Sequence, residues 1–261
     1  MAQTGDLQER SNDRLWLRRN LVRKYAHREL RPSEATVLRD FAADLSGRAL
    51  DIGCGAGRVT GHMAALSDQV VGIDVSAAMV DYARDTYPAV RFEVGDIRDL
   101  SGHADGSFDA IAAWCNIVDI LGHPARGWFL DEVRRLLAPG GLLVLCTHNV
   151  ANRDSLRKPT DVRLNSPRGL VIDLARLPRA LYHHGRLRRH ERVEDGYAIL
   201  NDISHDYMAL HYYVARAEQE RQLASRGFEL LACVASDGRT LAAGDPASDS
   251  PDLHFVARVE V

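Results

Sequence analysis

The sequence predicts an α/β protein in which helices cover both faces of a mostly parallel sheet. Five short apolar runs follow one another from Arg48, each punctuated by glycine or an acidic residue: ALDIG, VVGIDV, VRFEVGD, FDAIAAW and LLVLCT. Helical stretches separate most of these runs, and strands that alternate with helices form a parallel sheet with two covered faces. The chain has 261 residues, which is enough to bury a core of this kind.

Composition and charge are those of an ordinary globular protein. Hydrophobic residues make up 46%, and the formal net charge of -3 argues against a protein that binds polyanions over its whole surface. No run approaches the roughly 20 apolar residues that cross a bilayer, and the polar start MAQTGDLQERSNDR is unlike a signal peptide. We therefore expect a cytoplasmic protein without a membrane span. The four cysteines stand singly, which predicts reduced thiols rather than disulfides or a zinc site.

The predicted elements divide the chain into four regions. Residues 1–46 are expected to form N-terminal helices that close over a ligand, the second helix running from Pro32 through Leu45. Residues 47–148 hold the five strands. Between residues 149 and 214 strand and helix no longer alternate, which indicates an inserted cap over the substrate. Within this cap, the alternation in NDISHDYMALHYYV predicts a strand above the pocket. Residues 215–261 resume the pattern with a helix, AEQERQLASRG, and two strands, FELLACVA and LHFVARV.

The most informative segment is LDIGCGAGR, where a strand runs into three alternating glycines and then a helix. Glycine permits positive φ and lets a ligand lie against bare backbone. The next strand ends in Asp74, 21 residues after Gly53, where a carboxylate accepts hydrogen bonds from ribose hydroxyls. Arg58 occupies the place of the third glycine of a dinucleotide fold, and Asp51 would repel a pyrophosphate. The pattern therefore predicts a nucleoside with a cationic or amino-acid-like part, such as S-adenosyl-L-methionine.

Through these motifs the sequence resembles the class I S-adenosylmethionine-dependent methyltransferases. The resemblance rests on LDIGCGAG, GIDVS and GDIRDL, and covers roughly residues 47–147 before it resumes in the C-terminal helix and strands. It implies a Rossmann-like sheet of seven strands, mostly parallel with the last strand antiparallel, and S-adenosyl-L-methionine as the cofactor. The residues expected at the cofactor are Tyr25, Asp51, Gly53, Gly55, Gly57, Asp74, Val75, Met79, Asp96, Ile97 and Cys115.

The resemblance also implies a role for each part of this site. Asp51 and the glycines would hold the methionine portion, Asp74 the ribose and Asp96 the adenine amino group. Tyr25 would reach the methionine end from the N-terminal helices. Those helices carry Trp16 on an apolar stripe beside many arginines, so they also resemble a membrane-surface helix, although packing on the sheet edge is the interpretation that we adopt.

Methyl transfer to a hydroxyl needs a base near the methyl group, because the hydroxyl loses its proton as it attacks. The carboxyl ends of the fourth and fifth strands and the cap are the expected places for this base. His148 directly follows the fifth strand and is the first candidate, since imidazole titrates near neutral pH. The further catalytic candidates are Asp119 and His205, and the residues expected at the acceptor are His123, Asn149 and His211.

A divalent-metal site is an alternative for some of these residues. His148, Asp119, His205 and Asp206 offer imidazole and carboxylate ligands that would hold a metal such as Mg²⁺ against two substrate oxygens. Their spacing matches no recognised metal pattern, so the site that we expect has no metal.

The cap is basic although the whole chain is not. Residues 153–192 contain eleven Lys or Arg against four Asp or Glu. Such a segment attracts an anionic or polymeric acceptor by electrostatic steering, or else forms a solvated helix face. RNA binding is disfavoured, because Tyr182 is the only Phe, Tyr or Trp in the segment and single-stranded nucleic acids need stacking surfaces.

Together these features predict an S-adenosylmethionine-dependent methyltransferase that methylates a hydroxyl of a sugar, a glycan or a natural-product small molecule. The long cap favours an acceptor larger than a single amino acid, such as an oligosaccharide. Two alternatives stay open: N-methylation of an amine or a peptide N-terminus, and a regulatory protein that binds the cofactor without turning it over. Nucleic acid is not expected as a partner, and a homodimer is left open.

Overall fold

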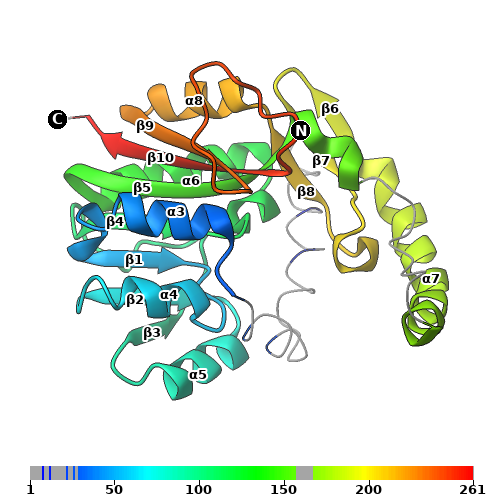
Figure 1. Cartoon of the computed structure of the whole chain (residues 1–261), viewed down its shortest axis with the longest axis horizontal. Helices are drawn as coiled ribbons and strands as arrows, with labels where there is room; N and C mark the ends of the chain where they lie inside the picture. Colours follow the sequence, from blue (N-terminus) through cyan, green and yellow to red (C-terminus); the bar gives the residue numbers. More distant parts are fainter. Residues whose placement is uncertain are drawn as a thin grey trace.

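The computed structural model describes residues 29–156 and 167–260, together with Gln8, Asn12, Val22 and Ala26. Figure 1 shows a large twisted sheet with helices on both faces and a smaller group of strands that leads from it to the long helix α7 (Pro167–Leu187). No helix within these ranges is both long and apolar enough to cross a membrane.

Seven strands form the sheet of the core. They are β1 (Ala49–Ile52), β2 (Val70–Asp74), β3 (Arg91–Val94), β4 (Phe108–Ala113), β5 (Leu137–Asn149), β9 (Phe228–Ala235) and β10 (Asp252–Val259). The first five run parallel in the order β3-β2-β1-β4-β5, and β10 pairs antiparallel with both β5 and β9. The predicted mostly parallel sheet with an antiparallel last strand is confirmed.

Helices pack on both faces of this sheet, as the sequence predicts. On one face, α6 (His123–Leu136) and α8 (Arg216–Ala224) contribute Phe129, Val133 and Leu223 to the larger apolar cluster. On the other face, α3 (Pro32–Asp40) and α4 (Arg58–Met63) contribute Val37 and Val59 to a second cluster. The remaining core helix, α5 (Ala77–Thr86), packs Val80 and Ala83 against Phe92 of the edge strand β3.

The N-terminal helix expected to open at Pro32 does so, with proline in the first turn where its missing N–H costs no hydrogen bond. The helix is shorter than predicted. It ends at Asp40, and Leu45 lies in the separate 3₁₀ turn η1 (Asp44–Ser46).

The sheet has ten strands rather than the seven that the resemblance implies. The three extra strands are β6 (Arg192–Glu194), β7 (Tyr197–Leu200) and β8 (His211–Val214), and all belong to the predicted cap. β5 continues beyond its last β4 pairing at Leu145, while β10 still occupies its other edge. The free edge of β5 then pairs in parallel with β8, His148 with Tyr213 and Asn149 with Val214. The cap strands are therefore an extension of the core sheet.

The strand predicted over residues 201–214 is wrong for its first ten residues. Residues Ser204–Tyr207 form a 3₁₀ turn, η5, and His205, Asp206 and Tyr207 have positive φ. The Asn201 amide donates to two carbonyls across this turn, those of Tyr207 and Ala209, at 2.9 and 2.6 Å. Such side-chain hydrogen bonds to nearby backbone compete with strand pairing, and the apolar alternation does not reveal them.

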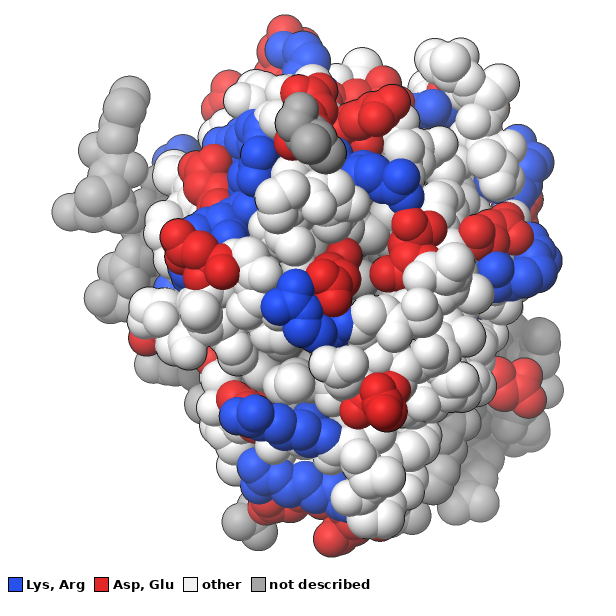
Figure 2. Space-filling model, turned by 90° about the vertical axis from the view of Figure 1, so that its left-hand side faces the viewer, with Lys and Arg blue, Asp and Glu red and all other residues white. Residues whose placement is uncertain are grey.

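Basic and acidic side chains are interspersed on the face that Figure 2 shows, the side on which the parallel core strands begin. The opposite side, where these strands end, lies toward the cap strands (Figure 1). The carboxyl ends of parallel strands are where open α/β sheets bind ligands.

Candidate active site

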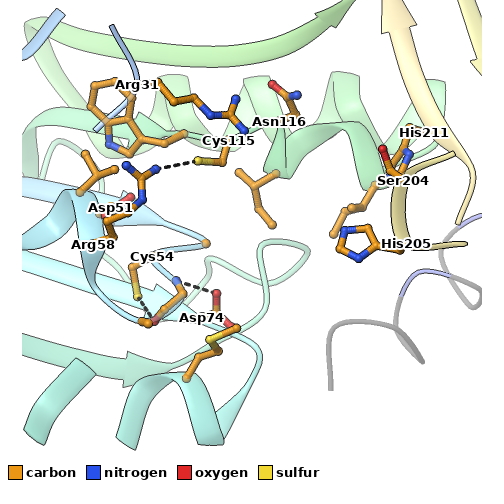
Figure 3. Close-up of a pocket in the computed structure, with 18 of the residues that line it drawn as sticks. Arg31, Asp51, Cys54, Arg58, Asp74, Cys115, Asn116, Ser204, His205 and His211 are labelled. Atoms are coloured by element: carbon orange, nitrogen blue, oxygen red, sulfur yellow. Dashed lines mark hydrogen bonds between the residues drawn. The ribbon is translucent and has the colours of Figure 1, made fainter. Parts of the chain in front are cut away.

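A pocket opens at the carboxyl ends of the core strands, beneath the cap, and Figure 3 shows its two walls. The wall on the core side includes Asp51, Gly53, Gly55, Arg58, Asp74 and Met79. The end toward the cap includes Asn116, Ile117, Ile120, His148, Ser204, His205 and His211. One pocket thus contains parts of both the cofactor site and the acceptor site that the sequence predicts.

The glycine loop after β1 has a backbone that favours glycine. Gly53, Gly55 and Gly57 have φ values of 69°, 54° and 80°. A Cβ at Gly53 would overlap the side chain of Ile117, whereas a Cβ at Gly55 would have nothing within 4 Å. Gly55 therefore presents bare backbone to open space in the pocket, where a ligand can approach closely.

Asp74, at the end of β2, fixes this loop. Its Oδ2 accepts a hydrogen bond from the Gly55 N–H at 2.9 Å, and its Oδ1 accepts one from the Ser76 N–H at 2.8 Å. Burial raises the pKa of Asp74, and the two backbone hydrogen bonds oppose that rise. A carboxylate has about four lone-pair positions, so both oxygens can still accept hydrogen bonds from a diol in the pocket.

At the cap end, His148 forms a pair with Asp119 of η2 (Ile117–Ile120). The His148 Nδ1 and the His148 backbone N–H both lie 2.7 Å from Asp119 Oδ2, and Asp119 is fully buried. Burial alone would lower the pKa of His148, but the hydrogen bond and charge of Asp119 outweigh it and raise that pKa to about 9. A carboxylate accepts but does not donate, so Nδ1 carries the proton and Nε2 is the nitrogen that exchanges one.

A second imidazole–carboxylate pair reaches the same pocket from the cap. Asp202 Oδ2 lies 2.8 Å from His211 Nδ1 and accepts a hydrogen bond from the Tyr213 hydroxyl at 2.6 Å. The His211 ring centre is 5.4 Å from that of His148, and the Tyr213 ring stacks on His148 at 4.8 Å. The charge of His211 and its hydrogen bond overcome burial and hold the pKa of Asp202 far below its usual range. Two oriented imidazoles thus lie side by side at the cap end.

Comparison with known proteins agrees with this geometry. Residues 49–141 match the protein family described as "Methyltransferase domain". This segment of the chain is therefore a methyltransferase domain. A ubiquinone biosynthesis O-methyltransferase of Xanthomonas oryzae pv. oryzae is 38% identical over 112 residues, 41% of this chain and 45% of that protein. The chain thus matches less than half the length of this relative.

Solved structures share the fold of this chain over nearly its whole length. An S-adenosylmethionine-dependent methyltransferase from Clostridium acetobutylicum has a TM-score of 0.60 at 13% identity, covering 96% of this chain and 99% of its own. The 1,6-didemethyltoxoflavin-N1-methyltransferase of Burkholderia thailandensis, solved with S-adenosylhomocysteine, has a TM-score of 0.55 at 14% identity, covering 97% and 84%. At these identities the comparison establishes the fold.

The core wall of the methyltransferase pocket fits S-adenosyl-L-methionine. Asp51 is buried, its Oδ2 accepts a hydrogen bond from Thr60 Oγ1 at 2.6 Å, and its Oδ1 has no partner within the described structure. Burial raises the pKa of Asp51 to about 7, because little around it compensates the charge. An unpartnered buried carboxylate oxygen is costly, and the cationic groups of this cofactor would supply the missing partner.

Sequence reasoning missed Glu34, which connects α3 to the glycine loop. Glu34 is fully buried, and its two carboxylate oxygens accept hydrogen bonds from the two terminal nitrogens of Arg58, at 2.6 and 2.7 Å. Burial would raise the pKa of Glu34, and the hydrogen bonds from Arg58 and the Arg31 backbone lower it instead. The available signal was its place in Pro32-Ser33-Glu34, since an acid in the first turn of a helix often caps it.

Cys115 lines the pocket beside this ion pair. Its sulfur lies 3.1 Å from Arg58 Nη2 and 3.3 Å from Glu34 Oε1, and its backbone has a positive φ of 55°. Burial raises the pKa of the Cys115 thiol to about 11. The group is therefore a neutral thiol at physiological pH, suited to contact with a ligand rather than to nucleophilic attack.

Two parts of the N-terminal segment contact residues around the pocket, one near η2 and the other near the glycine loop. The side chains of Gln8 and Asn12 donate hydrogen bonds to the carbonyls of Leu121 and Ile120, each at 3.0 Å. Further along, Val22 and Ala26 pack against Ala56 and Met79. Tyr25 and the apolar stripe with Trp16 lie outside the described residues.

Three predicted adenine contacts are not among the described residues that line the pocket. The Asp96 carboxylate is engaged by Arg98, with Nη2 at 2.6 Å and Nε at 2.9 Å, and Ile97 belongs to the larger apolar cluster. Val75 is also absent from the lining, whereas Met79 is present. An adenine contact by Asp96 would have to share its carboxylate with Arg98.

Two residues predicted to contact the acceptor, His123 and Asn149, make other contacts in the structure. The His123 ring stacks on Tyr197 at 4.2 Å, its Nδ1 is 2.7 Å from the Tyr212 hydroxyl, and it does not line the pocket. The Asn149 amide donates to carbonyls of the 246–250 loop and its oxygen accepts from Ala151. Both side chains are occupied in packing the cap and loop, and neither is among the described residues that line the pocket.

The four residues considered for a metal do not form a metal site. Within the described ranges there is no group of three or more His, Cys, Asp or Glu side chains placed to hold a metal ion. Both oxygens of Asp119 are already taken by donors from Arg126, Thr147 and His148. His205 lines the pocket but sits in the left-handed turn η5, away from a strand.

Proposed function

We propose that this protein is an O-methyltransferase that transfers a methyl group from S-adenosyl-L-methionine to a hydroxyl of a small molecule. The observation that carries the proposal is the His148–Asp119 pair, whose imidazole lines the same pocket as the glycine loop and Asp74. The ubiquinone biosynthesis O-methyltransferases that match its core support oxygen as the acceptor.

The cofactor supplies an electrophilic methyl group on a sulfonium. Asp74 would hold the ribose hydroxyls, Asp51 the cationic end, and Gly55 would allow close approach of the backbone. The acceptor hydroxyl would give its proton to His148 Nε2 as its oxygen attacks the methyl carbon, while the carbon–sulfur bond breaks. Asp119 keeps the other imidazole proton on Nδ1 and stabilises the imidazolium that forms.

The cap would determine the acceptor. His205, His211 and Ser204 offer polar groups opposite the glycine loop, and Ile117 and Ile120 offer apolar surface between them. Arg186, Arg188 and Arg189 are exposed on α7 and the following turn η4 (Arg188–His190), where they would favour an anionic or oligomeric acceptor. A sugar or natural-product hydroxyl, a cytoplasmic location and a homodimer stay predictions.

N-methylation is the second candidate, because the Burkholderia thailandensis protein of the same fold is an N1-methyltransferase. A neutral amine needs no base, so the two candidates differ in their dependence on His148. A cofactor-binding regulatory protein would show no turnover at all.

The test is to incubate the protein with methyl-labelled cofactor and fractionated host extract, and to identify the labelled product by mass spectrometry. We expect an O-methyl product, with a rate about 10² to 10⁴ times lower in His148→Gln. His103→Gln is the matched control, because His103 packs on Phe108 at the start of β4. An N-methyl product formed at a normal rate by His148→Gln would overturn the proposal.

A further inference from the structure

Arg126 is a buried cation that never reaches the pocket. It lies on α6, is 1% exposed, and donates from Nη1 to Asp119 Oδ1 at 2.7 Å. Its Nη2 donates to Thr147 Oγ1 at 3.0 Å and to Gln219 Oε1 of α8 at 2.7 Å. A buried charge is costly unless it is paired, so its position demands an ionised partner. Asp119 is that partner.

Asp119 divides its two oxygens between Arg126 and His148. Oδ1 receives hydrogen bonds from Arg126 and from the Thr147 hydroxyl, each at 2.7 Å. Oδ2 accepts hydrogen bonds from the His148 backbone N–H and from His148 Nδ1, also at 2.7 Å. Four donors saturate the carboxylate, which leaves no lone pair for a proton of its own. The Arg126 charge and the other donors outweigh burial and lower the pKa of Asp119.

Other charged groups lie near His148, but they do not contact the Asp119 carboxylate. Asp252 of β10 lies 4.0 Å from Nε2 and is itself paired with Arg31 at 3.1 Å. On the cap side, Asp202 is held by His211 and by the Tyr213 hydroxyl. Arg126 is the group that competes directly with His148 for the charge of Asp119.

We propose that Arg126 is a positioning residue that holds Asp119 ionised against His148, and thereby keeps one imidazole proton on Nδ1 and limits the proton affinity of Nε2. Without the guanidinium, Asp119 would direct its whole charge to the imidazole, and Nε2 would release its proton only at higher pH. The consequence for the reaction rests on the proposed function of His148, whereas the effect on the imidazole does not.

The experiment is NMR of ¹⁵N-histidine-labelled full-length protein, which reports the tautomer and titration midpoint of each imidazole. His148 is assigned by its absence in His148→Gln. In Arg126→Met, which removes the charge but keeps an unbranched side chain, the midpoint of His148 should rise by about 1 pH unit, the lower end of what one neighbouring charge does. Arg126→Lys should move it in the same direction by less, because an ammonium keeps the charge but cannot reproduce the separate contacts of the guanidinium to Asp119, Thr147 and Gln219.

The control is Arg135→Met, which also removes an arginine from α6 but breaks a partly exposed pairing with Glu132 and Asp105. It should leave the midpoint of His148 unchanged. A folded Arg126→Met with a wild-type midpoint and tautomer would overturn the inference. Should that variant fail to fold, Arg126→Gln also removes the charge, and an unchanged midpoint in it would overturn the inference equally.

Activity separates this inference from the proposed function. If His148 is the base, the inflection of kcat/KM with pH should move upward in Arg126→Met together with the NMR midpoint. An NMR midpoint that moves while the rate profile stays fixed would support the role of Arg126 and contradict the role of His148 as the base.

Discussion

His148 lies at the end of β5 with its backbone N–H and its imidazole both directed at Asp119. Because Asp119 raises the pKa of His148, the protonation state of His148 can be tested through the pH dependence of kcat/KM. With a pKa of about 9, raised by Asp119 against the effect of burial, His148 is an imidazolium at neutral pH and must lose a proton before it can act as a base. We therefore expect kcat/KM to rise about tenfold per pH unit up to about pH 9 and then to level. Initial rates between pH 6 and 10 measure this.

Asp119→Asn provides the comparison for that profile. The neutral amide removes the charge that raises the pKa of His148, so the inflection should move to lower pH while the rate on the plateau falls. A profile that is flat from pH 6 to 10 in the wild-type protein would exclude His148 as the titrating base.

Asp74 gives a second prediction at the level of single residues. Asp74→Ala should weaken the binding of S-adenosylhomocysteine by about 1.5 to 3 kcal/mol, the usual contribution of hydrogen bonds to a charged group. Isothermal titration calorimetry measures the change. Asp99→Ala is the control, because within the described structure the Asp99 side chain bonds only to Ser101, two residues later. Equal affinity in Asp74→Ala and wild type would remove Asp74 from the ribose site.

Whether a site residue can be recognised from the sequence depends on how far along the chain its contacts lie. The glycine loop and Asp74 are recognisable because a strand, a turn and the next strand end form one local pattern. Asp202 was missed because its partner His211 is met only after the turn η5, which is held by side-chain hydrogen bonds. Arg126 was missed because it looks like any arginine on a helix, and its burial depends on α8, which lies about 90 residues later in the chain.

Between elements, the Glu34–Arg58 pair is the contact that ties α3 to α4 at the edge of the pocket. Glu34→Gln keeps the shape but leaves the buried guanidinium without a charged partner. We expect the free energy of unfolding to fall by about 1.5 to 3 kcal/mol, as for other hydrogen bonds to charged groups. Urea denaturation measures it. Asp40→Asn, which breaks the exposed pair with Arg39 on the same helix, should cause no measurable change.

At the level of elements, strands with purely apolar signals were predicted well. β1, β2, β4 and β5 are buried and flanked by helices, so their apolar runs alone identify them. The cap strands β6 and β7 were not predicted. β6 is exposed along its whole length, and an exposed strand has no apolar face that the sequence could show.

For the whole molecule, His254 couples stability to pH. It is fully buried in β10 near Trp114, neither ring nitrogen has a hydrogen-bond partner within the described structure, and burial lowers its pKa to about 4. The unfolded chain binds the proton near pH 6.5 and the folded protein only near pH 4. Stability should therefore fall as the pH drops from about 6.5 to 4, by up to about 3 kcal/mol from this residue.

Urea denaturation at pH 7.5 and pH 5 tests this contribution. His254→Leu should lose less stability between these two pH values than wild type, because it has no proton to bind in the unfolded state. His62→Leu changes an exposed histidine and should lose as much as wild type. An identical loss in all three proteins would show that His254 does not cause the acid sensitivity between these two pH values.

The length of β5 has a consequence for how such a protein can diversify. Its last two residues, His148 and Asn149, both pair with β8 of the cap, and His148 also pairs with β10 of the core. A foreign insert can therefore replace residues 150–214 and still pair with the core sheet, provided that it ends in a strand able to pair in parallel with these two residues. Such chimeras would inherit the cofactor wall and the imidazole unchanged while acquiring a new acceptor range, which makes this seam a natural point of recombination.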